Sequence, residues 1–322
     1  MLGTTDVCIQ DNRRLGAGNA LTTCHSERTR RILLTICHSE RTRRILRLRP
    51  LAFAQGDKHF APRSNHHPPT HVAGIAAGNG TSSGGKYAGI APEANLAAVK
   101  ILDAEGKGSA ADVLAGVQWL IDNRERYNIR IANLSIGTAD AGSSDPLVRA
   151  VEAAWDAGIV MLVAAGNNGP ASGSVTSPGI SRKVITVGAS DDNRTVTIWG
   201  DSVVHFSGRG PTTECIVKPD VVAPGAEITS CLTNTPISDT RRASLRIVSP
   251  AYVEMSGTSM STPMVAGAVA LLLEKHPALT PNEVKLWLKQ STVSLRYTQN
   301  QQGWGLLDVG ALLRKGDVQN GQ

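Results

Sequence analysis

The pattern of hydrophobic and polar positions divides the chain into two unlike parts near residue 70. From there on, short runs rich in valine, isoleucine, leucine and alanine alternate with longer segments of helical periodicity. Strands that alternate with helices predict βαβ units, and therefore an α/β fold with a mostly parallel sheet flanked by helices. The expected strands span residues 96–102, 129–136, 160–165 and 184–189, and the expected helices span residues 109–126, 146–157 and 259–275.

Two helix starts carry side chains suited to capping. Ser109 and Asp112 have the spacing of a capping box, in which each side chain binds the backbone N–H of the other residue. Thr280 and Glu283 repeat this spacing. Pro281 stands at the first helical position, where the N–H that proline lacks would have no acceptor within the helix. A further helix is therefore expected to begin at Pro281.

The first 50 residues differ from the rest in charge and in pattern. They hold ten arginines and four acidic residues, which accounts for the whole net charge of +6 and leaves 23 basic and 23 acidic residues elsewhere. The sequence CHSERTRRIL at 24–33 recurs unchanged at 37–46. Two copies at a period of 13 do not make a solenoid. The block is similar to peptides read through dispersed bacterial repeat DNA, an interpretation we prefer to a metal site built from its Cys-His pairs.

Composition limits the remaining possibilities. Aromatic residues make up only 4% of the chain against 41% hydrophobic residues, so the core must be aliphatic. Three of the five cysteines lie before residue 50, which leaves Cys215 and Cys231 as expected free thiols. No apolar run reaches the ~20 residues of a membrane span, and the start lacks a signal-peptide pattern. The localisation is left unassigned, cytoplasmic by default, with secretion of an intact parent chain still open.

The segment SGTSMSTP at 256–263 leads directly into a stretch of small apolar residues. A serine in the first turn of a helix has its hydroxyl near backbone N–H groups and the positive end of the dipole, which favour developing negative charge. Gly257 permits close approach of backbone and substrate, and Pro263 is expected in the first turn, where no N–H is required. Alone, a serine-rich helix cap would explain the pattern. As a complete octapeptide, it resembles the nucleophile motif of the subtilisin-like serine proteases (subtilases, peptidase S8), which implies that Ser259 is the nucleophile.

Other segments resemble the same family in the family's order. The segment AAGNNG at 164–169 resembles the oxyanion-hole motif, which implies that Asn167 donates to the tetrahedral intermediate. The segment NLSIG at 133–137 resembles the strand that pairs with substrate. The segments at 206–211 and 218–225 match two further family signatures, interpreted as structural loops, and the segment at 87–96 matches the one that follows the family's histidine helix. The substrate-binding residues implied by the resemblance are Ser135, Ile136, Gly137, Ala165 and Gly166.

The resemblance extends from about residue 70 to 313 and is closest to the AprX-like bacterial branch. It implies the three-layer subtilisin-like α/β fold, with a mostly parallel sheet and helices on both faces. On this basis residues 66–316 are expected to form the peptidase domain, residues 1–65 an unmatched, disordered, arginine-rich leader, and residues 317–322 a tail.

The histidine motif departs from the family pattern. The family sequence His-Gly-Thr-His-Val-Ala-Gly, whose first histidine is catalytic, stands here as HPPTHVAG at 67–74. Pro68 therefore aligns with the catalytic position, and His71 aligns with the second, non-catalytic histidine. His67 lies one residue early, a displacement of up to ~3.8 Å. Either a one-residue bulge returns His67 to the site as the base, or the base is absent.

The aspartate motif of the family, a strand ending in Asp-Thr-Gly, does not occur upstream. Asp11 and Asp57 are the candidates for the missing carboxylate, and neither stands in that motif. Because the same segment supplies an interior strand of the family's sheet, the domain is expected to lack that strand and to leave backbone edges unpaired.

Three functions stay open at this point. The first is a serine-type endopeptidase that acts as a monomer on protein or peptide substrates, without cofactor, metal, nucleic acid or membrane partner, although calcium is common in the family. The second is an inactive pseudoprotease that binds peptides, or a truncated remnant of a disrupted reading frame. The third is a DNA-binding protein that uses the arginine-rich leader as its arm.

Overall fold

The computed structural model describes residues 68–101, 108–138, 142, 144–232 and 245–315, together with the backbone of 7–10 and 32–37. His67, Asp11 and Asp57 lie outside these residues, as do most of the arginine-rich leader and the tail. Among the described residues, none of the helices is both long enough and apolar enough to span a bilayer. Cys215 and Cys231 are free thiols, as the sequence predicts.

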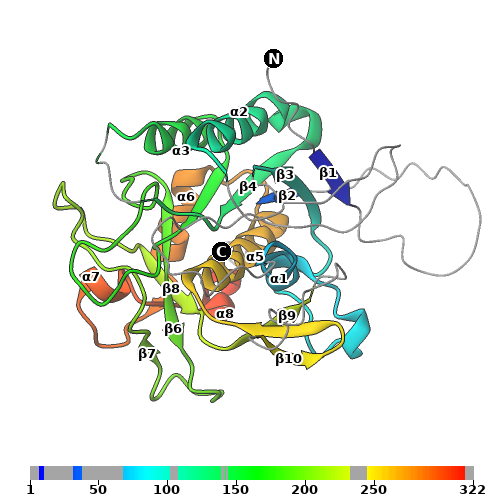
Figure 1. Cartoon of the computed structure of the whole chain (residues 1–322), viewed down its shortest axis with the longest axis vertical. Coiled ribbons are helices and arrows are strands. Elements are labelled where there is room, and N and C mark those ends of the chain that lie inside the picture. Colours follow the sequence, from blue (N-terminus) through cyan, green and yellow to red (C-terminus); the bar gives the residue numbers. More distant parts are fainter. Residues whose placement is uncertain are drawn as a thin grey trace, which may run out of the picture.

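A large, mostly parallel sheet forms the centre of the molecule (Figure 1). Its strand order is β1-β3-β2-β4-β5-β6-β8-β13-β12, with the short β7 paired to β6. Pairing is antiparallel only at β1–β3, β12–β13 and β6–β7. The strands are β1 (Val7–Gln10), β2 (Ile32–Cys37), β3 (Asn95–Lys100), β4 (Ile129–Leu134), β5 (Val160–Ala164), β6 (Ile185–Asp191), β7 (Ser202–Val203), β8 (Val221–Pro224), β12 (Thr292–Val293) and β13 (Leu306–Leu307).

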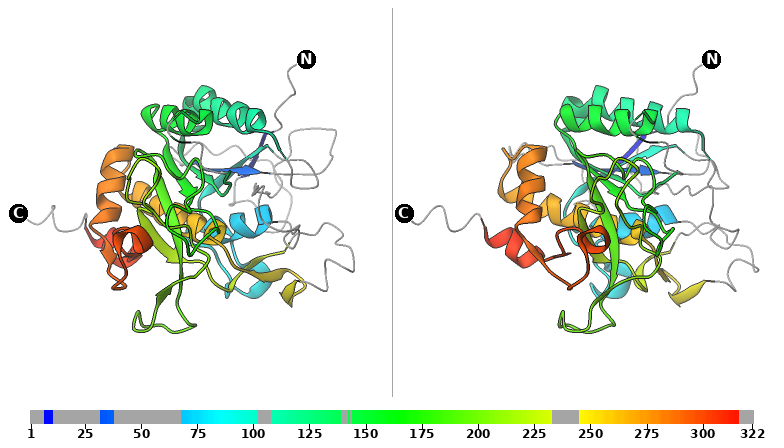
Figure 2. Two further views of the ribbon diagram at one scale, coloured as in Figure 1. Left: turned by 60° about the vertical axis from the view of Figure 1, so that its left-hand side comes forward. Right: turned by 90° about the vertical axis from the view of Figure 1, so that its left-hand side faces the viewer.

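Helices cover both faces of this sheet, which gives the three layers expected for the family fold (Figure 2). Helices α2 (Ala110–Tyr127) and α3 (Pro146–Asp156) pack side by side on one face, and α1 (Pro68–Ala77) and α5 (Thr258–Lys275) pack together on the other. Helices α6 (Pro281–Lys289), α7 (Gln299–Gln302) and α8 (Val309–Arg314) follow α5, and a 3₁₀ turn, η2 (Thr81–Ser83), follows α1. The α/β prediction is confirmed.

A second, three-stranded antiparallel sheet lies beside α1 and was not anticipated from the sequence. Its strand order is β10-β11-β9, and each strand is only four residues long. Runs this short, with partly exposed residues, carry little periodic signal. The strands are β9 (Ile228–Cys231), β10 (Arg246–Ser249) and β11 (Tyr252–Met255).

Both predicted capping boxes are present. Ser109 and Asp112 bind each other's backbone N–H at the start of α2, and Thr280 and Glu283 do the same at the start of α6. The hydrogen bonds from Ser109 lower the pKa of the Asp112 carboxyl, because they favour its charged form. Each box satisfies two N–H groups that the helix itself leaves without acceptors.

The sheet contains an interior strand that was expected from the sequence to be missing. The backbone of β2, which comes from the leader, runs parallel to β3 from Ile32 to Cys37 and parallel to β4 from Ile32 to Thr35. The expectation of an unfilled position between β3 and β4 is therefore wrong for the backbone. The physical reason is that two facing strand edges offer unpaired N–H and C=O groups, and the apolar run ILLTI supplies a segment of high strand propensity to pair with them.

Helix α5 packs so closely against α1 and against Ile90, in the chain that follows η2, that one of its positions must be glycine. A Cβ atom at Gly267 would lie 2.6 Å from Ile90 Cβ and 3.0 Å from the carbonyl oxygen of Ala76. The neighbours of Gly267 in α5, Ala266 and Ala268, are completely buried. The small-residue pattern of α5 thus allows close packing in a core that has few rings to fill space.

We therefore expect Gly267→Ala to lower the free energy of unfolding by about 1–3 kcal/mol, the usual cost of inserting a methyl group into a packed core. Gly310→Ala in α8 is the matched control, because its Cβ would first meet the flexible end of Arg314, at 3.0 Å. Urea unfolding of both variants measures the difference. Equal stabilities would contradict the packing argument.

Candidate active site

Ser259 is the second residue of α5 and is 4% exposed. The helix begins after Gly257, and a Cβ at that position would lie 3.4 Å from Asn167 Nδ2. The N–H groups at a helix start have no partner within the helix and stabilise negative charge near them. The predicted first-turn position of Ser259 is therefore confirmed by the helix boundary.

Asn167 binds the start of the same helix, although it lies 91 residues earlier than Thr258 in the chain. Its Oδ1 accepts hydrogen bonds from the backbone N–H of Thr258, at 2.9 Å, and from the Thr258 hydroxyl, at 3.1 Å. The hydroxyl oxygen of Thr258 accepts from the N–H of Gly166, at 3.2 Å. Oδ1 thus accepts two hydrogen bonds. The donor of the amide is Nδ2, and no described residue accepts a hydrogen bond from it.

Ser135, just after the end of β4, contacts the backbone of Ser259, the predicted nucleophile. Its hydroxyl donates to the backbone carbonyl of Ser259 at 3.2 Å and accepts from Asn133 Nδ2 at 3.0 Å. Pro263 explains why this carbonyl needs a donor from outside the helix. Pro263 is the sixth residue of α5, and its missing N–H is the one that would bind the carbonyl of Ser259, four residues earlier. The expectation that Pro263 lies in the first turn is therefore wrong.

The segments after β4 and β5 lie next to each other at the carboxyl edge of the sheet, because the two strands are parallel neighbours. Gly166 has a φ of +90°, and a Cβ there would lie 2.5 Å from Thr176 Oγ1. The N–H of Thr176 donates to the carbonyl of Ala165 at 3.0 Å. Thr138 exchanges two backbone hydrogen bonds with Ser177, at 2.9 and 3.0 Å, so the chain after Gly137 is held as well. These contacts hold in place the two chain segments that carry the predicted substrate-binding residues.

The structure thus joins most of the predicted site residues around the start of α5. Hydrogen bonds link Ser135, Gly166 and Asn167 to this helix start, and Ile136, Gly137 and Ala165 are their chain neighbours. His67 lies outside the described residues. Thr258 was not singled out from the sequence, although its position beside the predicted nucleophile in SGTSMSTP was the available signal.

Helix α1 begins at Pro68, the residue that aligns with the family's catalytic histidine. His71, one turn further on, is fully buried and faces the second sheet. Its Nε2 lies 2.9 Å from the carbonyl of Ile228 and 3.1 Å from that of Val253, while Nδ1 has no partner among the described residues. The imidazole of His71 thus connects α1 to β9 and β11.

Burial lowers the pKa of His71 to about 4, against the opposing effect of the two carbonyl hydrogen bonds. A second proton would place an N–H at Nδ1, where no described acceptor lies. His71 is therefore neutral near pH 7. Among the described residues, no cluster of histidine, cysteine, aspartate and glutamate side chains is arranged to hold a metal ion.

We expect acid to destabilise the fold through His71. The unfolded chain binds this proton near pH 6.5 and the folded chain only near pH 4, so the free energy of unfolding falls between these values by up to about 1.4 kcal/mol per pH unit. His71→Gln should lose this part of the slope in urea titrations from pH 4 to 7. His205→Gln, at an exposed position, is the control. A His71→Gln slope equal to that of the unchanged chain would contradict the assignment.

A mostly parallel three-layer fold, a serine at the start of a buried central helix and an asparagine that follows a neighbouring strand define the class of subtilisin-like serine peptidases. The chain belongs to the subtilase family (Peptidase_S8), whose model matches residues 54–305. The match begins at residue 54, inside the stretch 1–65 that was expected from the sequence to be unmatched.

Named relatives agree with this assignment. The chain is 50% identical over 230 residues to the serine protease AprX of Bacillus subtilis (strain 168), covering 69% of this chain and 52% of that protein. It is 33% identical over 245 residues to subtilisin Savinase of Lederbergia lenta, covering 76% and 77%. The solved S41 psychrophilic protease superposes with a TM-score of 0.60 at 30% identity, covering 74% and 76%. The chain thus spans about half the length of AprX, and the predicted resemblance to that branch is confirmed.

Proposed function

We propose that this chain is a serine endopeptidase that hydrolyses peptide bonds through an acyl-enzyme on Ser259. The observation that carries the proposal is the pair of hydrogen bonds between Asn167 Oδ1 and Thr258, because they hold the amide beside the residue that precedes the nucleophile. The Nδ2 of Asn167 is then the donor for the oxyanion, together with backbone N–H groups at the start of α5. The proposal includes action as a monomer, without a cofactor.

The substrate in this proposal is an extended protein or peptide segment. It lies along Ser135, Ile136 and Gly137 on one side and Ala165 and Gly166 on the other. Those two segments form the carboxyl edge of adjacent parallel strands, where ligands of such sheets bind. An extended chain satisfies its own backbone groups by pairing with such segments.

The base in this proposal is His67, which precedes the first residue of α1 in the chain. In the acylation step the Ser259 hydroxyl gives its proton to the imidazole as its oxygen attacks the scissile carbonyl. The imidazolium then gives the proton to the leaving amine. Water, deprotonated by the same imidazole, attacks the acyl-enzyme, and the acid is released as the proton passes to the Ser259 oxygen. In subtilisin, loss of one triad member lowers turnover by roughly 10⁴–10⁶, so the activity depends strongly on where His67 lies.

A second function, a peptide-binding pseudoprotease, is favoured by one observation. Pro68, which cannot act as a base, begins α1 at the aligned catalytic position, and the histidine within that helix, His71, is occupied by the carbonyls of Ile228 and Val253. In this case the site keeps its oxyanion donor and substrate edge but binds peptides without cleaving them.

A fluorophosphonate probe separates the two functions, because it labels only a serine that is activated. We expect Ser259 to be labelled and Ser259→Ala to stay unlabelled. Asn167→Asp keeps the acceptor for Thr258 but removes the Nδ2 donor, so it should lower turnover of a peptide substrate by about 10²–10³, with little change in KM. Folded, soluble protein that takes up no label would refute the endopeptidase and support the pseudoprotease.

The source of the base is tested by substitution at two neighbouring positions. If His67 is the base, His67→Ala should reduce the labelling rate by at least about 10²-fold. If the base is absent, His67→Ala should have no effect, and Pro68→His should raise the rate by a similar factor. Pro68→Ala is the control for the loss of the proline ring, and circular dichroism verifies that each variant is folded.

A further inference from the structure

The hairpin loop of residues 192–201, which joins β6 to β7, carries an apolar surface. Among the described residues, six large hydrophobic side chains are exposed, and three of them lie within four positions of this loop: Val196, Ile198 and Trp199. Val196 is fully exposed and Trp199 is 75% exposed. The loop projects away from the large sheet beyond β7 (Figure 1). Single exposed apolar residues are normal on a protein surface, whereas a cluster of them marks an interaction site.

Hydrogen bonds within the hairpin loop hold its shape. The N–H of Asn193 donates to Asp191 Oδ1, and that of Arg194 donates to Asp192 Oδ1, each at 2.9 Å. The side-chain amide of Asn193 donates across the loop to the carbonyl of Gly200 at 2.6 Å. The polar side chains therefore bind the backbone of the loop, and the apolar ones are left facing solvent.

The base of the hairpin loop lies next to the proposed active site. The N–H of Ala165 donates to the carbonyl of Val187 at 2.9 Å, and β6 continues four residues further, which is about 13 Å. The carbonyl of Ser190 accepts from the N–H of Gly225, whose own carbonyl accepts from the N–H of Gly257, both at 2.8 Å. Two backbone hydrogen bonds thus connect the end of β6 to the residue before α5.

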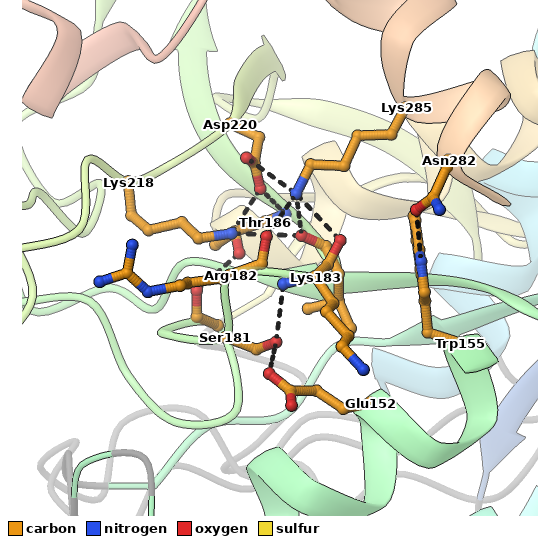
Figure 3. Close-up of polar contacts among 12 residues, drawn as sticks. Glu152, Trp155, Ser181, Arg182, Lys183, Thr186, Lys218, Asp220, Asn282 and Lys285 are labelled. Carbon is orange, nitrogen blue, oxygen red and sulfur yellow. Dashed lines mark hydrogen bonds and ion pairs between the residues drawn. The ribbon is translucent and has the colours of Figure 1, made fainter. Parts of the chain in front are cut away.

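The other end of β6 is held by α6. Lys285 Nζ donates to the backbone carbonyls of residues 182–184, each at 2.9 Å, just before the strand begins (Figure 3). Asp220 Oδ2 accepts from the N–H of Thr186, in the first turn of the pleat, at 2.8 Å. The strand is therefore tied at both ends, and the hairpin loop keeps a defined position relative to the start of α5.

Negative charge predominates at the hairpin loop. Asp191, Asp192 and Asp201 lie at its base, while Arg194 is ion-paired with a glutamate of β11 at 3.3 Å and Arg296 lies over the Trp199 ring at 5.6 Å. Burial, and then the charges of Asp192 and Asp191, raise the pKa of Asp201. Among the described residues, Asp201 Oδ1 is buried without a hydrogen-bond partner. A cationic group of an occupant would stabilise these carboxylates.

We propose that the hairpin loop is an exosite, a binding surface outside the active site, for substrate segments in which apolar side chains adjoin lysine or arginine. The apolar side chains cover Val196 and Trp199, and the basic ones pair with the aspartates. This role rests on the proposed function, in which residues 135–137 hold one half of the substrate on the β4 side of Ser259. Since β6 lies on the opposite side of β5, the other half of the substrate is the one that reaches the loop.

Binding to the Ser259→Ala chain tests the surface without catalysis. Fluorescence anisotropy compares two labelled peptides of equal length, with leucine alternating with lysine in one and with glutamate in the other. The lysine peptide should bind at least about tenfold more tightly at low ionic strength, and salt should reduce this difference. Adding Trp199→Ser should weaken its binding by about tenfold. Leu286→Ser, at a half-exposed position on α6, is the matched control and should change nothing.

Peptide cleavage tests the role in catalysis. Trp199→Ser should raise KM for the lysine peptide by a similar factor and leave kcat unchanged. A tripeptide p-nitroanilide is too short to reach the loop, so its hydrolysis should be unaffected. Val196→Ser, at a fully exposed position, repeats the test if Trp199→Ser does not fold.

The possible failures are distinguishable. Peptide binding that depends on Trp199 in a chain whose Ser259 takes up no fluorophosphonate would refute the proposed function but keep the binding surface. Normal labelling, with both loop variants binding the lysine peptide as tightly as the Leu286→Ser control, would refute the exosite alone. A dimer in sedimentation velocity that Trp199→Ser dissociates would assign the surface to a second copy of the chain and also overturn the exosite.

Discussion

The hydrogen bonds between Asn167 and Thr258 are the interaction on which the proposed site depends. They join the end of β5 to the start of α5 across 91 residues of chain, and they fix both the amide and the helix start. A mobile Asn167 amide would have to be ordered during the proposed reaction, whereas an amide held by hydrogen bonds is already ordered by folding. The buried hydroxyl of Thr258, which accepts from Gly166 while donating to Asn167, makes the arrangement a closed network rather than a single contact.

The sequence predicted those parts of the structure that depend on local patterns. Periodicity predicted the strands of the parallel sheet and the helices that cover it. Cap spacing predicted the capping boxes at Ser109 and Thr280, and a specific motif predicted Ser259 at the start of α5. The sequence did not predict the role of Thr258, because its partners lie far away in the chain. Nor did it predict the donor for the Ser259 carbonyl, which required knowing that Pro263 is the sixth helical residue rather than part of the first turn.

The interior strand β2 shows a different limit of sequence patterns. Family comparison identifies a strand by its motif, and that motif is absent from residues 32–37. Sheet formation requires only a backbone that can pair on both sides, with a run of suitable propensity. The backbone position between β3 and β4 is therefore filled while the catalytic chemistry usually carried by that strand is not supplied by its sequence. Fold and catalytic competence are separate properties of this chain.

The bond from Ser135 to the Ser259 carbonyl has a consequence for how the site responds to an occupant. Within a regular helix, this carbonyl would be held by the helix alone and would not respond to events at the sheet. Here its donor belongs to the segment along which an extended peptide would lie. In the proposed enzyme, a displacement of that segment would change the hydrogen bond that holds the Ser259 backbone, which links the position of an occupant to that of the hydroxyl.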